Sequence, residues 1–218
     1  MNDVTLVVTT CDRPFYLDEC LASLPDVRRI VVDDSSQGYN RDRNRGVAER
    51  RGCEYVGSAH VGTSGARLAG LALVASEFFA FFDDDDVMLP NWLPLHLEAI
   101  RKADVVGSAH WETDANLRPM KLQALPAPTM AGLLRCQVPI SDNALFRRSA
   151  LKGVTWHPER NHVMMLSLWL ALMAKGARFA MLDTPTWMYR IHGANQTPAT
   201  RDEQDAAFRR EAIAEYAR

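Results

Sequence analysis

The stretch "EFFAFFDDDD", residues 77–86, places four consecutive aspartates at the end of an aromatic run. A short, continuous apolar run of this kind is typical of a strand buried on both faces of a sheet. The four neighbouring carboxylates repel one another, and any partial burial raises the cost of keeping them ionised. The stretch therefore predicts an interior strand over 77–84 whose far end faces something positively charged.

Strand-like and helix-like segments alternate through the first hundred residues. Apolar, β-branched runs such as "TLVVTT" predict strands, while Pro14 and Gly52 mark the start and the end of predicted helices. The predicted strands cover 5–10, 28–34, 53–58 and 77–84, and the predicted helices cover 14–24, 40–52, 63–76 and 91–103. Continuous apolar strands joined by helices predict an α/β fold with a mostly parallel, Rossmann-like central sheet flanked by helices.

The second half of the chain is less regular. It predicts a strand over 104–113, a loop followed by a helix over 117–135, a strand into a turn over 140–151, a helix over 162–176, a strand pair over 178–193 and a terminal helix over 202–218. No internal repeat or convincing linker divides the chain. We therefore expect one domain over 1–218.

Composition and charge limit the possible partners. With 218 residues, 47% of them hydrophobic, the chain can build a packed core, and a formal net charge of −2 gives no general attraction to nucleic acid or anionic lipid. The longest apolar run, 163–174, is too short for a membrane span, and the N-terminus lacks signal-peptide features. We expect a cytoplasmic protein in which the scattered Cys11, Cys20, Cys53 and Cys136 are reduced, mostly buried thiols.

Polar side chains collect where the predicted strands end. Parallel sheets of this kind bind ligands outside the carboxyl ends of their strands. That rule brings several distant segments to one edge, with the residues Thr9, Thr10, Asp12, Arg13, Asp33, Asp34, Asp83, Asp84, Asp85 and Asp86. The sequence therefore predicts a single site.

The aspartates have more than one interpretation. In a strand, Asp83 and Asp85 would point the same way, and a D-x-D pair suits Mg²⁺ or Mn²⁺ that completes its shell with diphosphate oxygens and water. A solvated loop that caps the next helix is a plainer alternative. A response-regulator site also uses paired acids, but it would need them after the first strand, whereas Asp33 and Asp34 follow the second.

Four segments decide between these interpretations when they are taken in order. "TLVVTTCDRPFYLDECLASL", "RRIVVDDSS", "GTSGARLAGLALVASEFFAFFDDDDVMLPNWL" and "YRIHGANQT", within residues 4–197, resemble family 2 glycosyltransferases of the GT-A fold, the nucleotide-sugar-dependent inverting type. The resemblance implies a nucleoside diphosphate sugar donor, an unidentified acceptor and Mn²⁺ or Mg²⁺. It also implies a donor-binding half over about 1–113, an acceptor-side half over about 114–200 and a terminal helix over 201–218.

The resemblance assigns roles to particular residues. The first loop lines the nucleotide pocket, the acid pair Asp33 and Asp34 meets the base, and Arg67 lies near the ribose and diphosphate, although Leu68 replaces the usual Asn of that element. The implied donor-binding set is Thr9, Thr10, Arg13, Asp33, Asp34, Arg67, Asp83 and Asp84. The implied metal-binding set is Asp85 and His192.

One feature of the family is missing. Inverting transfer needs a base that takes the acceptor hydroxyl's proton. Met164 and Met165 stand where the family has a Glu-Asp pair, and neither can accept a proton. Asp142 is the first substitute base that we consider, and Glu159 and His162 are the alternatives.

Two further function classes stay open at the level of sequence. A nucleotide-sugar-binding relative that has lost turnover would keep the pocket and explain the two methionines. A nucleotidyltransferase would share the sheet and the acids, but it should carry a Gly-rich, basic first loop that "VVTTCDRP" lacks. The sequence does not fix the sugar, the nucleotide base or the oligomeric state, for which a homodimer is one option.

Overall fold

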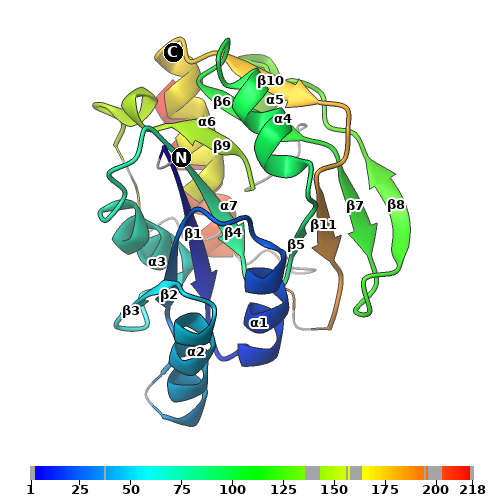
Figure 1. Cartoon of the computed structure of the whole chain (residues 1–218). Helices are drawn as coiled ribbons and strands as arrows, with labels where there is room; N and C mark the ends of the chain where they lie inside the picture. The colour runs from blue at the N-terminus through cyan, green and yellow to red at the C-terminus, as the bar shows by residue number, and fades with distance from the viewer. Residues whose placement is uncertain are drawn as a thin grey trace.

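The computed structural model describes residues 3–36, 38–135, 143–155, 157, 164–193, 195 and 203–216. Its centre is a seven-stranded sheet in the order β10-β6-β9-β4-β1-β2-β3 (Figure 1). These strands are β1 (Val4–Thr10), β2 (Arg28–Asp33), β3 (Glu54–Gly57), β4 (Phe78–Asp83), β6 (Val105–Ser108), β9 (Leu145–Arg147) and β10 (Phe179–Leu182). Every pairing in this sheet is parallel except those of β9 with β4 and β6, so the predicted fold class is confirmed.

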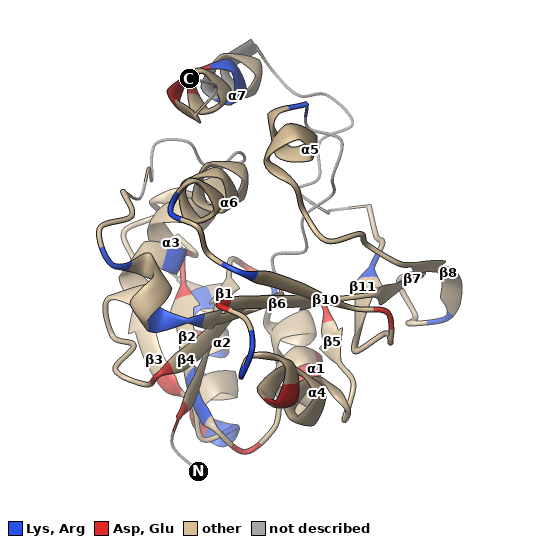
Figure 2. Ribbon diagram, turned by 90° about the horizontal axis from the view of Figure 1, so that it is seen from above, with Lys and Arg blue, Asp and Glu red and all other residues tan. Residues whose placement is uncertain are grey.

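Helices cover both faces of the central sheet (Figure 2). One layer contains α1 (Pro14–Ser23), α2 (Tyr39–Arg50) and α4 (Trp92–Ala99). The opposite layer contains α3 (Gly62–Leu71), α5 (Met130–Leu134), α6 (Met164–Ala174) and α7 (Glu203–Tyr216). The first two predicted strands and the first two predicted helices therefore agree with the structure to within a few residues at each end.

The central strands are buried on both faces, as their continuous apolar runs predicted. In β1, Leu6 and Val8 join the core beneath α1 and α4, while Val7 joins the core beneath α3 and α6. In β4, Phe79 and Phe81 lie on the α6 side and pack edge to face with ring centroids 5.4 Å apart. Two separate apolar layers therefore hold the sheet rigid between the helices.

A second, four-stranded sheet in the order β5-β11-β7-β8 extends from the central one. Its strands are β5 (Val87–Met88), β7 (His110–Thr113), β8 (Pro119–Gln123) and β11 (Trp187–Arg190). Strand β11 pairs with β5, which directly follows the four aspartates. This pairing brings the C-terminal part of the chain to the end of β4.

The structure corrects several predicted elements in this region. The predicted loop in 117–135 contains β8, because a proline is tolerated as the first residue of an edge strand and Pro119 is in that position. The predicted strand 104–113 is divided at Ala109, where the chain leaves the central sheet for the small one. The predicted helix 63–76 already ends at Leu71 and the predicted helix 91–103 already ends at Ala99. Strand β5 was not predicted.

The remaining predictions agree where the chain is described. Strand β9 with the 3-10 turn Arg148–Leu151 lies within 140–151, α6 lies within 162–176, β10 and β11 form the predicted strand pair, and α7 is the terminal helix. Cys11, Cys20 and Cys53 are free thiols, the last two buried, while Cys136 is outside the described residues. None of the helices in the described ranges combines the length and the hydrophobicity of a membrane span.

Helix α3 lies unusually close to the sheet because a glycine faces it. A Cβ atom at Gly70 would lie 2.3 Å from Cγ1 of Val7 and 3.0 Å from Cγ2 of Val32, which is closer than atoms can pack. The same helix carries Arg67, so this close contact fixes the height of that guanidinium above the strand ends.

Gly70→Ala should lower the free energy of unfolding by about 1–3 kcal/mol, because the added methyl group overpacks the contact with β1 and β2. The matched control is Gly46→Ala in α2, where a Cβ would meet only the Arg50 side chain at 3.5 Å. The control should change stability by less than about 1 kcal/mol, in the stabilising direction, because alanine is the better helix former. Urea unfolding of both variants measures this, and equal midpoints would contradict the close contact.

Candidate functional site

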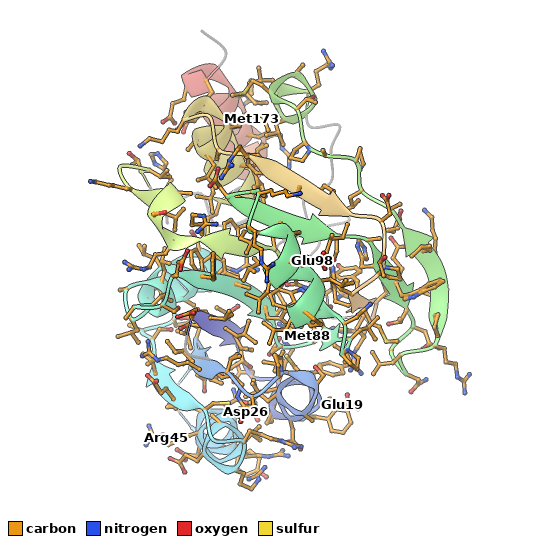
Figure 3. All side chains as sticks on the ribbon, turned by 45° about the horizontal axis from the view of Figure 1, so that its top comes forward. Glu19, Asp26, Arg45, Met88, Glu98 and Met173 are labelled. Atoms are coloured by element: carbon orange, nitrogen blue, oxygen red, sulfur yellow. The ribbon has the colours of Figure 1, made fainter. Side chains whose placement is uncertain are left out.

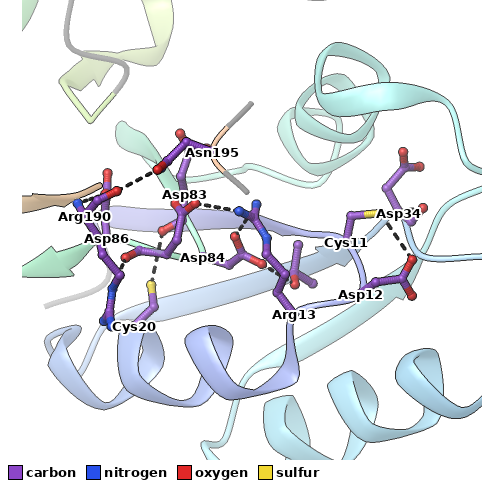
Figure 4. A network of polar contacts seen from close by, with 12 residues as sticks. Cys11, Asp12, Arg13, Cys20, Asp34, Asp83, Asp84, Asp86, Arg190 and Asn195 are labelled. Atoms are coloured by element: carbon purple, nitrogen blue, oxygen red, sulfur yellow. Dashed lines mark hydrogen bonds and ion pairs between the residues drawn. The ribbon is translucent and has the colours of Figure 1, made fainter. Parts of the chain in front are cut away.

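The carboxyl ends of β1, β2 and β4 meet at one edge of the central sheet. Thr10 is the register partner of Asp33, and Thr9 is the register partner of Asp83. The backbone continues this alignment beyond the strands, where the Asp34 amide donates to the Thr10 carbonyl at 2.8 Å. The predicted convergence of these strand ends is therefore present, and Figure 4 shows the polar network built on it.

Asp83 to Asp86, which we call the aspartate turn, do not share two strand faces. Strand β4 ends at Asp83, and the turn that follows points each side chain in its own direction. Asp83 pairs with Arg67 through Oδ1 and Nη2 at 2.7 Å. The four carboxylates meet cations and hydrogen-bond donors from several other segments of the chain, and Asp84 and Asp85 share Arg13.

Asp84 is the most deeply buried of the four. The Thr10 hydroxyl donates to its Oδ2 at 2.6 Å, and Arg13 Nη2 lies 2.7 Å from its Oδ1. Burial raises the pKa of Asp84 to about 8, while Arg13 and the Thr10 hydroxyl oppose the rise and the Asp85 and Asp83 carboxylates add to it. With Oδ2 accepting from Thr10 and Oδ1 beside Arg13, Asp84 organises the turn from inside the protein.

Asp85 and His192 meet at the aspartate turn. Asp85 Oδ2 lies 3.1 Å from His192 Nε2 and 2.5 Å from Arg13 Nη1. The His192 ring also lies against the Tyr16 ring of α1, with centroids 4.7 Å apart and the two planes tilted by 35°. The histidine therefore comes from the loop after β11 and is held over the aspartate turn by an aromatic contact.

The Asp85–His192 pair fits a divalent cation as two neighbouring ligands. Ligands at right angles around a six-coordinate ion with bonds of about 2.1 Å lie about 3 Å apart, which matches the separation of these two atoms. Within the described residues no group of three or more His, Cys, Asp or Glu side chains could hold a metal.

Asp86 ties the turn to two other segments. Its Oδ2 accepts from Asn143 Nδ2 at 2.9 Å, and its Oδ1 accepts from the Arg190 amide at 3.1 Å. Burial raises the pKa of Asp86 well above its usual value, with the Asp85 and Asp83 carboxylates adding to the rise and the Asn143 and Arg190 hydrogen bonds lowering it. Asp86 thus acts as an internal anchor for the chain entering β9 and for the end of β11.

Arg190 is a buried cation that the sequence analysis did not identify. Its Nε donates to the Asp85 carbonyl at 2.9 Å, its Nη2 lies 2.9 Å from Glu19 of α1, and its guanidinium lies 4.8 Å from the centre of the Tyr16 ring. Figure 3 labels Glu19 and Figure 4 labels Arg190. The segment "YRIHG" that identified His192 contained this residue two positions earlier, but only the fold reveals that its side chain turns under the aspartate turn.

The acid pair after β2 is engaged within the protein. Asp33 accepts from the Ser35 amide at 2.9 Å and from the Tyr55 hydroxyl at 2.8 Å. Asp34 accepts from the Val61 and Gly62 amides, both at 2.8 Å, and from the Ser58 hydroxyl. Asp34 therefore fastens the start of α3 to the end of β2.

The loop between β1 and α1, residues 11–13, is also shaped by local contacts. Asp12 has a φ of 57°, in the left-handed region, and its amide donates to the Ser35 hydroxyl at 2.7 Å. Burial raises the pKa of the neighbouring Cys11 thiol to about 11, and the Asp12, Asp34 and Asp33 carboxylates add to the effect, so this cysteine is not a thiolate nucleophile. The loop therefore presents Arg13, not Cys11, to the site.

The acceptor side is only partly described. Met164 and Met165 are buried in the core between α6 and the sheet, with exposed fractions of 3% and 7%. The two positions where the resemblance expects a catalytic Glu-Asp pair are therefore occupied by side chains that pack in the core. The substitute bases Asp142, Glu159 and His162 lie outside the described residues.

The sequence matches a model of one protein family. The model described as "Glycosyl transferase family 2" matches residues 5–155, which is more than half of the chain. A search of curated proteins gave no match.

Solved structures of TarS from S. aureus share the fold. TarS 1–349 in complex with UDP-GlcNAc superposes with a TM-score of 0.77 at 16% identity, covering 99% of this chain and 66% of that one. TarS 1–349 alone gives 0.69 at 19% identity, covering 87% and 60%, and its UDP complex gives 0.66 at 17%, covering 100% and 71%. In the superposition on TarS 1–349 alone, the chain thus spans 60% of the length of that structure.

Arg190→Gln should lower the free energy of unfolding by about 3 kcal/mol or more, because it removes a buried cation from Glu19, Tyr16 and the aspartate turn. The control is Arg178→Gln, which breaks the solvent-exposed pair of Arg178 with Asp104 and should leave the urea midpoint nearly unchanged. If both variants unfold at the wild-type midpoint, Arg190 does not hold the turn.

Proposed function

This chain belongs to glycosyl transferase family 2, and we propose that it transfers a sugar from a nucleoside diphosphate sugar to an acceptor with inversion at the sugar carbon. The observation that carries this proposal is the convergence of Arg13, Asp85 and His192 at the strand ends, where a diphosphate and a metal can meet. TarS, which shares the fold, was solved with UDP-GlcNAc and with UDP, so UDP-linked sugars are the first donors to test.

Metal dependence is part of the proposal. Asp85 and His192 would hold Mn²⁺ or Mg²⁺, and the ion would supply a Lewis acid that stabilises the charge developing on the departing diphosphate. The two-ligand arrangement supports this role, because it leaves most of the coordination shell to donor oxygens and water.

Donor binding would use the cations and acids that surround this pair. Arg67 is held at the level of the strand ends by Asp83 and lies over the Phe81 ring, with its guanidinium 5.7 Å from the ring centre. A fixed guanidinium of this kind suits phosphate oxygens. Thr9 and Thr10 are the last residues of β1 and lie next to the first loop. Asp33 or Asp34 would meet the base or ribose through carboxylate lone pairs that its internal hydrogen bonds do not use.

The reaction also needs a proton acceptor. The acceptor hydroxyl oxygen would attack the sugar carbon from the side opposite the diphosphate, the bond to the diphosphate oxygen would break, and a base would take the hydroxyl proton. We propose Asp142 as that base, supported by the contact of its chain neighbour Asn143 with Asp86 of the aspartate turn. Glu159 and His162 are the alternatives.

A second candidate function is binding without turnover. The buried Met164 and Met165 favour it, because the family's base position is occupied by side chains that pack in the core. Such a protein would keep metal-dependent nucleotide binding and lack sugar transfer.

In a thermal-shift screen of UDP, GDP, ADP and CDP with and without Mn²⁺, at least one nucleotide should raise the melting temperature more with the metal, because ligands that bind only the folded state stabilise it. Asp85→Ala should abolish the metal-dependent part of that shift. The matched control is Asp114→Ala, a half-buried aspartate in the turn between β7 and β8, which should retain it. A full metal-dependent shift in Asp85→Ala would overturn the assignment of the metal site.

Asp142→Asn should reduce sugar transfer by roughly 10²–10⁴-fold, the usual contribution of a positioned base, while leaving the affinity for the nucleoside diphosphate unchanged. Single-turnover transfer and calorimetry separate the two effects. Glu159→Gln and His162→Gln are the parallel variants, and whichever of the three shows the loss identifies the base. If wild type binds donor but transfers no sugar to any acceptor in a broad screen, the binding protein is the better description.

A further inference from the structure

Arg13 connects two carboxylates of the aspartate turn. Its Nη2 lies 2.7 Å from Asp84 Oδ1 and its Nη1 lies 2.5 Å from Asp85 Oδ2. The second of these oxygens is also the atom 3.1 Å from His192 Nε2. The oxygen best placed to bind a metal is therefore already paired with a guanidinium.

We propose that Arg13 is a built-in counter-cation that leaves Asp85 when a divalent cation binds, and that the donor's diphosphate draws it away. Metal and nucleoside diphosphate would then bind cooperatively, each more tightly in the presence of the other. This inference rests on the proposed function, because it requires the Arg13 guanidinium to pair with the diphosphate of the proposed donor once it has left Asp85.

Charge balance gives the physical reason. Arg13 lies between the Asp84 and Asp85 side chains and already places one positive charge beside the Asp85 carboxylate in the ligand-free protein. A divalent cation added on Asp85 beside the guanidinium would make the pocket net positive and would bring two cations onto one oxygen at close range, where a partly buried site screens repulsion poorly. A diphosphate supplies the missing negative charge and bidentate acceptors that suit a guanidinium.

Arg13 is better placed for this exchange than the other two arginines of the site. Its side chain is 22% exposed, whereas those of Arg67 and Arg190 are 3% and 2% exposed. Arg67 pairs with Asp83, and Arg190 contacts Asp85 through the backbone carbonyl. Arg13 therefore combines contact with the Asp85 carboxylate with access to the solvent side from which a donor arrives.

The first test measures Mn²⁺ binding in the absence of nucleotide, by electron paramagnetic resonance of the free ion and by calorimetry. Arg13→Gln should bind Mn²⁺ about tenfold more tightly than wild type, within the usual range of coupling between sites. A gain in affinity on removing a residue of the site is the distinctive result, because a residue that merely supports the pocket would cause a loss.

The second test adds UDP, GDP, ADP or CDP. In wild type, the nucleotide that binds should raise the affinity for Mn²⁺ by about 5-fold or more. In Arg13→Gln, the same nucleotide should change the affinity for Mn²⁺ little. Nucleotide binding itself should weaken in Arg13→Gln, because the diphosphate loses a guanidinium partner.

Two control variants separate charge from shape. Arg13→Lys keeps the positive charge and should bind Mn²⁺ as weakly as wild type. Arg51→Gln removes an arginine that pairs with Asp18 on the surface, with side-chain exposures of 38% and 41%, and should leave the affinity for Mn²⁺ unchanged.

A double variant keeps the test valid if Arg13→Gln does not fold, since that change leaves the buried Asp84 without its cation. Arg13→Gln with Asp84→Asn is then compared with Asp84→Asn alone, and the double variant should bind Mn²⁺ about tenfold more tightly. Circular dichroism establishes which variants are folded.

The outcomes separate this inference from the proposed function. Equal Mn²⁺ affinity in wild type and the folded Arg13→Gln forms overturns the role of Arg13, and the proposed function survives if nucleotide and metal still bind wild type. If no nucleotide binds wild type with or without Mn²⁺, the donor assignment and the cooperative exchange are both wrong.

Discussion

Four carboxylates at the end of a buried strand can exist only if cations and hydrogen-bond donors reach them, and the rest of the site follows from that constraint. Three arginines contact the aspartate turn: Arg13 from the loop after β1, Arg67 from α3 and Arg190 from the end of β11. Removing such charges from water is expensive unless each is paired. The aspartate turn thereby connects segments that the chain order keeps apart, and it fixes their relative positions with an accuracy that apolar packing alone does not supply.

The sequence predicted the central sheet well because burial leaves a direct mark on composition. Phe79 and Phe81 on one face and Phe82 on the other could only belong to a strand covered on both sides. The small sheet was harder to predict. Strand β8 is exposed, begins with Pro119 and is stabilised by pairing with β7, and a single-sequence pattern cannot reveal such pairing.

The functional site was also predictable only in part. Thr10, Asp33 and Asp83 could be brought together from sequence because parallel strands end at a common edge. The direction in which each aspartate side chain points could not be predicted from sequence. Side chains alternate between the two faces only within a strand, and β4 ends at Asp83, so the turn that follows decides the directions of the other three. Arg190 and Tyr16 were missed because their contacts join distant parts of the sequence. Arg190 meets the Asp85 carbonyl across 105 positions, and Tyr16 near the N-terminus contacts both Arg190 and His192, so only the completed fold shows that they support His192 and Asp85.

The contacts of β11 also determine when the site can form. Asp85 meets His192 across 107 positions of sequence and Asp86 meets Arg190 across 104. Contacts of this separation carry a large loop-closure cost and form late in folding. During synthesis the segments that form β1, β2 and β4 can therefore emerge and collapse before β11 exists. The contacts of Asp85 with His192 and of Asp86 with Arg190 are completed only after β11 has been made.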